Sequence, residues 1–188
     1  MRLFALGLIA SAMILVSPDA QDWMLDDLPT SGWLGLYAHQ LKPVRVRLKE
    51  KQHIEVTPPK PELILRDIPR LAAGPVTEAK YEPGLIEDGK PVAIRHGGET
   101  FELRLAANNR VTLHHRAETQ VLFPAPEFVD EPHFALVWAG DLDRDGRLDL
   151  ITVLSPKYSW FPYEVWLSSA AVKGEIVHRI AHYDRYGC

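Results

Sequence analysis

The stretch from Asp141 to Asp149 constrains this chain more than any other part of its sequence. It reads Asp-Leu-Asp-Arg-Asp-Gly-Arg-Leu-Asp, with carboxylates at positions 1, 3, 5 and 9 and a glycine at position 6. This is the spacing of a calcium loop, in which alternate carboxylates turn toward one point and the glycine lets the chain bend around the ion. Without a cation, converging carboxylates would repel one another by about 4 kcal/mol per pair at a surface-like dielectric. The spacing therefore predicts bound Ca²⁺.

Five residues are predicted to hold the ion. They are the carboxylates of Asp141, Asp143, Asp145 and Asp149 and the backbone carbonyl of Arg147. The alternative is a solvated acidic turn, because Asp and Gly are both common in turns. The loop is not a complete EF-hand, because Thr152 stands at position 12, where that loop carries a bidentate Glu.

The runs on both sides of the loop predict strands. Residues 134–138 (Phe-Ala-Leu-Val-Trp) precede the loop, and residues 148–154 (Leu-Asp-Leu-Ile-Thr-Val-Leu) follow it. In the second run one face carries Leu148, Leu150 and Leu154, and the other carries Ile151 and Val153. Apolar residues on both faces favour a strand that is buried on both sides.

The run that begins Gly140-Asp141-Leu-Asp-Arg-Asp-Gly resembles the calcium loop of FG-GAP/VCBS repeats, the units of integrin-type β-propellers. The resemblance covers about residues 134–183 and implies the same five ligands. It also implies a further strand, for which residues 164–169 are the candidate. A propeller needs several blades, and the sequence holds no second Asp-x-Asp-x-Asp-Gly motif. A complete propeller is therefore not expected.

The N-terminus is typical of a secretory signal peptide. Met1-Arg2 is followed by an apolar run over residues 3–16 and by small residues up to Ala20. The run is shorter than the roughly 20 residues of a membrane-spanning helix, so we expect export to the periplasm or the medium and no membrane span after cleavage. The alternative is a buried N-terminal helix or a retained anchor. Outside the cytoplasm, a weak calcium site with a dissociation constant of about 10⁻⁴–10⁻³ M would serve as a structural staple.

Short segments with alternating polarity predict an all-β fold, a sandwich or barrel-like arrangement of antiparallel sheets with the calcium loop between two strands. Residues 44–48 pair in this prediction with 54–56, and residues 101–105 pair with 111–113 across Asn108-Asn109. Residues 69–91 are expected to be mostly loop, and residues 175–183 fit a strand or a helix. The expected division is a signal peptide (1–20), an N-terminal β-rich part (21–125) and an FG-GAP-like part (126–188) that forms one compact unit with it.

Composition limits the partners. The formal net charge is −4, whereas nucleic-acid-binding domains are usually strongly basic, so no nucleic-acid partner is expected. Cys188 is the only cysteine, so an intrachain disulfide cannot form, and the thiol is either free or joins two chains as a disulfide-linked dimer.

Residues 158–166 are dense in aromatic side chains. If exposed, Trp160, Phe161 and Tyr163 are the candidates for binding a carbohydrate or protein ligand. The alternative is that these rings pack in the core and in a hairpin around Pro162.

No catalytic residues are predicted, since the sequence has no Gly-x-Ser-x-Gly, His-Glu-x-x-His or phosphate-binding glycine motif. The expected function is that of an exported calcium-binding β domain with a structural or ligand-binding role. The alternative function is that of a secreted hydrolase with structural calcium and unidentified catalytic residues.

Overall fold

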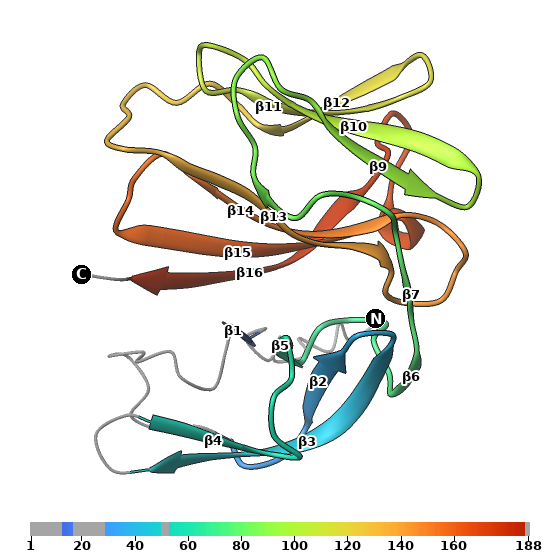
Figure 1. Ribbon diagram of the computed structural model, residues 1–188, viewed down its shortest axis with the longest axis vertical. Coiled ribbons are helices and arrows are strands. Elements are labelled where there is room, and N and C mark those ends of the chain that lie inside the picture. The colour runs from blue at the N-terminus through green and yellow to red at the C-terminus, as the bar shows by residue number, and fades with distance from the viewer. Residues whose placement is uncertain (1–12, 17–28, 50–52, 187–188) are drawn as a thin grey trace, which may run out of the picture.

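The computed structural model describes residues 13–16, 29–49 and 53–186, which form three antiparallel sheets lying in layers (Figure 1). The lower sheet contains, in spatial order, β1 (Met13–Val16), β5 (Leu63–Arg66), β2 (Trp33–Tyr37), β3 (Gln40–Lys49) and β4 (His53–Thr57), with β6 (Gly74–Pro75) also paired with β3. The middle sheet contains β16 (His178–Tyr186), β15 (Trp160–Leu167), β14 (Asp149–Ser155), β13 (His133–Asp141) and β7 (Thr77–Glu78), with β8 (Gly84–Leu85) also paired with β13. The upper sheet contains β12 (Glu118–Phe123), β11 (Val111–His115), β10 (Glu99–Leu105) and β9 (Val92–His96).

The predicted all-β class is confirmed. A short 3-10 turn, η2 (Ser168–Ala170), interrupts the strands between β15 and β16. None of the sheets in the described residues closes into a barrel, so the arrangement is that of a layered sandwich. Within the same residues, no helix is long and apolar enough to cross a bilayer.

The central strands of the middle sheet, β13, β14 and β15, are largely buried on both faces, as the apolar runs beside the acidic loop predict. Between the upper and middle sheets lies the upper core, which includes Leu103, Leu113, Leu136, Leu148, Leu150, Leu154 and Trp166. Between the middle and lower sheets lies the lower core, which includes Leu36, Leu65, Trp138, Leu142, Ile151, Val153 and Tyr163. The two predicted faces of β14 therefore enter different cores, and all of its residues are buried.

Alternating segments pair as hairpins where the sequence predicts them. β3 pairs with β4, and β10 pairs with both β9 and β11. Asn109, between β10 and β11, has a φ of 62°, the left-handed geometry that Asn tolerates in a tight turn. The ambiguous segment near the C-terminus forms the strand β16 rather than a helix.

The described part of the predicted loop over residues 69–91 has only two-residue strands. Two of them have a structural role, because β7 and β8 both pair with β13 and so extend the middle sheet beyond its hairpins. This segment also carries the chain from the lower sheet to the upper one (Figure 1).

For Tyr163 the alternative of core packing is confirmed, whereas the expected hairpin around Pro162 is wrong. Tyr163 is buried in the lower core, because it lies on the face of β15 that the lower sheet covers. Pro162 lies within β15 opposite Asp184 of β16, rather than in a hairpin. The pairing of β15 with β14 begins only at Tyr163. Pro162 therefore lies outside the β14–β15 ladder, where its missing N–H is not needed.

Other expectations fall on residues that the structure does not describe. Of the predicted signal peptide, only Met13–Val16 is described, and it forms β1 against β5. The remainder of residues 1–20 and Cys188 lie outside the described ranges. Cleavage of the leader and a disulfide through Cys188 therefore stay predictions.

Candidate metal centre

The ends of two neighbouring strands bring the first and last predicted ligands together. β13 ends at Asp141 and β14 begins at Asp149, and Gly140 pairs directly with Asp149. The seven residues between them form the connecting loop. A hairpin of the middle sheet therefore places positions 1 and 9 of the acidic motif beside each other.

Two leucines fix the intervening loop. Leu142 is 1% exposed and belongs to the lower core, whereas Leu148 is 2% exposed and belongs to the upper core. Arg144 and Gly146 turn the chain between them with φ of 68° and 84°. Because each end of the loop is anchored in a different core, the polar residues between the two leucines gather at the strand ends.

Gly140 is required by the close approach of β7. A Cβ atom at this position would lie 2.2 Å from the carbonyl oxygen of Thr77 and 2.6 Å from the ring of Trp138. β7 pairs with β13 here, with Glu78 opposite Gly140 and Thr77 opposite Asp141. The glycine before the acidic motif thus allows β7 to pack directly behind the site.

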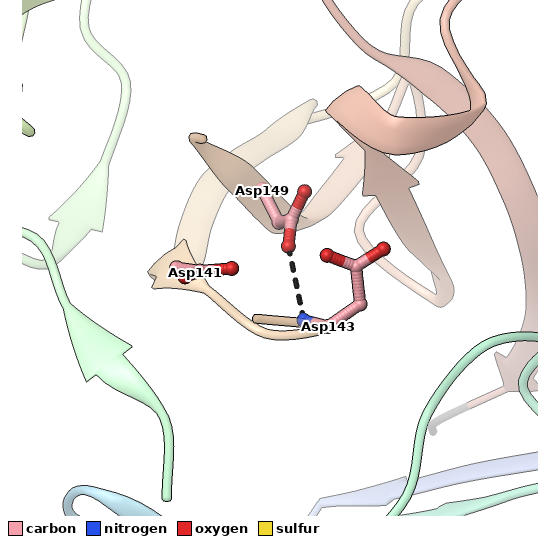
Figure 2. Close-up of side chains that lie close together, drawn as sticks. All are labelled: Asp141, Asp143 and Asp149. Atoms are coloured by element: carbon pink, nitrogen blue, oxygen red, sulfur yellow. Dashed lines mark hydrogen bonds between the residues drawn. The ribbon is translucent and has the colours of Figure 1, made fainter. Parts of the chain in front are cut away.

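Three of the four predicted carboxylates converge (Figure 2). Asp141, Asp143 and Asp149 each offer one oxygen atom, and these atoms lie within 4.8 Å of one another. Asp141 is 8% exposed, Asp149 is fully buried and Asp143 is half-buried. The cluster could hold a metal ion.

Backbone N–H groups hold two of these carboxylates in place. Asp141 accepts hydrogen bonds at 3.0 Å from the N–H of Asp145 and from that of Gly146. Asp149 Oδ2 accepts from the N–H of Leu142 at 2.8 Å and from that of Asp143 at 3.3 Å, the contact drawn in Figure 2. The loop therefore wraps around its own carboxylates.

The 3-10 turn η2 closes the other side of the site. Ser168 donates to Asp149 Oδ1 through its N–H at 2.9 Å and through its hydroxyl at 3.3 Å. Ser169 Oγ donates to Asp143 Oδ2. These two serines follow β15, and the sequence analysis did not single them out as part of the site. Their only local signal is a pair of small hydroxyl residues at the end of the candidate strand 164–169, and the observed strand β15 ends just before them, at Leu167.

One oxygen in the cluster lacks a partner. Asp143 Oδ1 is buried, and no hydrogen bond reaches it among the described residues. A buried acceptor without a donor costs roughly 1–3 kcal/mol, and more when it is charged. A cation at the centre of the cluster would satisfy this oxygen, so the residues fit a metal ion.

Charge repulsion among the three carboxylates also makes the triad unfavourable without a cation. Burial, with a smaller contribution from the charge of Asp143, raises the pKa of Asp149 to about 7, although the N–H groups of Ser168 and Leu142 act to lower it. At separations of up to 4.8 Å, each pair of charged carboxylates repels by about 3–4 kcal/mol at a dielectric of about 20. A divalent cation would convert this repulsion into attraction.

Asp145 and Arg147, the other two predicted ligands, contact each other. Asp145 Oδ2 accepts a hydrogen bond from Arg147 Nε at 2.8 Å, and Asp145 Oδ1 accepts from the N–H of Arg147 at 2.9 Å. The carboxylate of Asp145 is therefore paired with the Arg147 guanidinium and is not part of the converging triad. Their roles as ligands stay predictions.

No family model matches the chain, and no curated protein or solved structure matches it. The resemblance of the loop to FG-GAP/VCBS repeats therefore rests on the residues of the loop alone. The site itself is defined by geometry, as three carboxylates at one end of the middle sheet.

The three aromatic candidates for ligand binding are half-buried or buried. Trp160 is half-buried and donates from Nε1 to Asp184 Oδ1 at 2.6 Å. Phe161 packs against the lower core, with its ring edge-on to His133 at 5.3 Å between centroids. With Tyr163 buried, these three side chains do not form one open platform.

Proposed function

We propose that this protein is an exported calcium-binding β domain in which the ion fastens the β13–β14 hairpin to the turn after β15. The observation that carries the proposal is the convergence of Asp141, Asp143 and Asp149, in which the buried Asp143 Oδ1 has no hydrogen-bond partner among the described residues. The export part rests on the leader-like residues 1–20.

The donor set favours calcium. All three converging groups are carboxylates, and oxygen ligands suit hard cations such as Ca²⁺, Mg²⁺ and Mn²⁺ rather than Zn²⁺. Ca²⁺ accepts six to eight ligands in flexible geometry. The triad, the Arg147 carbonyl and Asp145 after release from Arg147 would supply such a shell together with water. The likeness of the loop to FG-GAP/VCBS repeats supports the same choice.

The role of the ion would be structural. Asp149 joins β14 to η2 through Ser168, and Asp143 joins the loop to η2 through Ser169. An ion held by both carboxylates would tie three consecutive strands of the middle sheet together. A ligand that binds only the folded state stabilises it by mass action.

Thermal unfolding with calcium and with EDTA tests this proposal. At calcium concentrations ten to a hundred times the dissociation constant, the ion should add about 1–3 kcal/mol and raise the Tm by about 3–10 °C. Asp143→Asn should abolish that rise. In EDTA the same variant should be at least as stable as the wild type, because one repelling charge is removed.

The matched control is Glu127→Gln, which removes one exposed carboxylate far from the loop in sequence. It should keep the full calcium response. A wild-type Tm that is the same in calcium and in EDTA would refute the proposal, and so would an Asp143→Asn variant that responds to calcium like the wild type.

A further inference from the structure

A cleft lies beside the acidic loop, between the upper and middle sheets. It has a volume of about 280 Å³, close to the lower end of the range for small-ligand pockets. One wall is the loop at Gly146, Arg147 and Leu148, and the opposite wall is the turn between β9 and β10. The two walls approach each other at Gly97 and Gly146, where a Cβ added to Gly97 would lie 3.7 Å from the carbonyl oxygen of Gly146.

The lining of this cleft is apolar in its depth. Phe101 is 6% exposed and Leu148 is 2% exposed, and Ile176 packs against the same upper core. The ring of His115 stacks on Phe101, with 4.1 Å between the ring centroids. The cleft therefore offers apolar and aromatic surface to a ligand of one-ring size.

Hydrogen bonds hold the walls in place. Gln120 Oε1 accepts from the N–H groups of Ile176 and Val177, and its Nε2 donates to the carbonyl of Val177 at 2.7 Å. Ser168, on the loop side, is held by Asp149. A cavity whose walls are fixed before binding costs a ligand less ordering entropy.

The rim is acidic. Glu99, Glu118 and Glu175 line the cleft, against one guanidinium, that of Arg147. Arg147 is already paired with Asp145, and Glu99 is already paired with Arg116. A hydrogen bond from the N–H of Val172 and, to a lesser extent, one with the His178 ring hold the pKa of Glu175 below its usual value. This carboxylate is therefore charged at neutral pH. Glu175 also contacts the His178 ring, with 2.7 Å between His178 Nδ1 and Glu175 Oε2. The three rim carboxylates outnumber the one guanidinium, so the net charge of the rim is negative.

We propose that this cleft binds a small organic cation, in which an amine, amidine or guanidinium group is carried on a flat apolar body. The body lies against Phe101, Leu148 and Ile176, and the cationic group meets Glu118 and Glu175 at the rim. The site does not require the metal ion, although the acidic loop supplies one of its walls.

NMR titration of the full chain with benzamidine tests the proposal, with benzamide as its uncharged isostere. Benzamidine should shift the amide signals of the cleft, including those of Leu148 and Ile176, to saturation. Benzamide should bind about five- to tenfold more weakly, since it cannot pair with the two carboxylates. Shifts that do not saturate, or equal binding of the two compounds, would overturn the proposal.

Two variants separate charge from shape. Glu118→Gln combined with Glu175→Gln should weaken benzamidine about five- to tenfold and leave benzamide unchanged. Glu127→Gln, outside the cleft, should bind both compounds like the wild type. Unchanged benzamidine binding in the double variant would overturn the role of the rim.

The titrations are run once with saturating calcium and once with EDTA. Saturable benzamidine binding in a protein that ignores calcium would uphold the cleft and refute the calcium site. A normal calcium response without benzamidine binding would uphold the calcium site and refute the cleft as a cation site.

Discussion

At the scale of single residues, hydrogen bonds to individual carboxylate oxygens and one close backbone contact fix the shape of the acidic loop. The three carboxylates of the triad accept hydrogen bonds from the loop and from η2, and the buried Asp143 Oδ1 has no hydrogen-bond partner among the described residues. Behind them, Gly140 admits the backbone of β7 at a distance that no side chain would allow.

The variant Gly140→Ala tests this close approach. Its methyl group would meet the Thr77 backbone and the buried Trp138 ring, so we expect a loss of at least about 2 kcal/mol of unfolding free energy in urea. Gly98→Ala is the matched control, because its φ is +82° and no atom lies within 4 Å of the added methyl group. It should cost only about 1 kcal/mol, from the left-handed backbone. Equal losses in the two variants would show that β7 does not press on Gly140.

At the scale of elements, the loop is a hairpin connection fastened into two cores by Leu142 and Leu148. Leu142→Ala and Leu148→Ala should each lower the free energy of unfolding by about 3–5 kcal/mol, the cost of deleting a fully buried leucine side chain. Val172→Ala, at a side chain that is 60% exposed, should change it by less than about 0.5 kcal/mol. Denaturant unfolding measures all three, and losses below about 1 kcal/mol at both leucines would contradict this anchoring.

Local patterns were sufficient to predict the elements around the site. Alternation identified the hairpins of β3 with β4 and of β10 with β11, and two apolar faces identified β14 as a strand buried on both sides. Asn108-Asn109 marked a turn for the same local reason. These features depend on neighbours in the sequence, so the sequence contains them directly.

Contacts between distant segments could not be predicted in the same way. β7 lies in a stretch rich in proline and glycine, and it becomes a strand only because β13 offers an open edge. Ser168 and Ser169 join the site because β15 returns beside β14. Tyr163 is buried because a third sheet covers that face, and no periodicity within residues 158–166 reveals a third sheet.

At the scale of the whole molecule, a middle sheet covered on both sides brings half-buried ionisable groups into the layers. His133, at the start of β13, packs edge-on to Phe161, and burial lowers its pKa below the ordinary 6.5. Between pH 6.5 and the lowered pKa, the unfolded chain binds a proton that the folded chain does not. The contribution of His133 to the free energy of unfolding is therefore fully present above about pH 6.5. It is lost as the pH falls through the pKa of His133 in the folded state.

The variant His133→Gln should flatten this dependence. In EDTA, the free energy of unfolding of the wild type should decrease more steeply between pH 7 and pH 5 than that of the variant. Urea unfolding at a series of pH values measures the two slopes. Since the lost ring contact shifts the whole curve, the slopes and not the absolute values are compared, and equal slopes would show that His133 is not linked to folding.

The most direct test of the metal centre is calorimetric titration of Ca²⁺ into the metal-free full chain. The convergence of Asp141, Asp143 and Asp149 predicts one ion per chain, with a dissociation constant of about 10⁻⁴–10⁻³ M. Asp143→Asn should remove the binding heat while the protein stays folded. A wild-type chain that is folded and gives no binding heat up to millimolar calcium would show that these carboxylates do not form a calcium site.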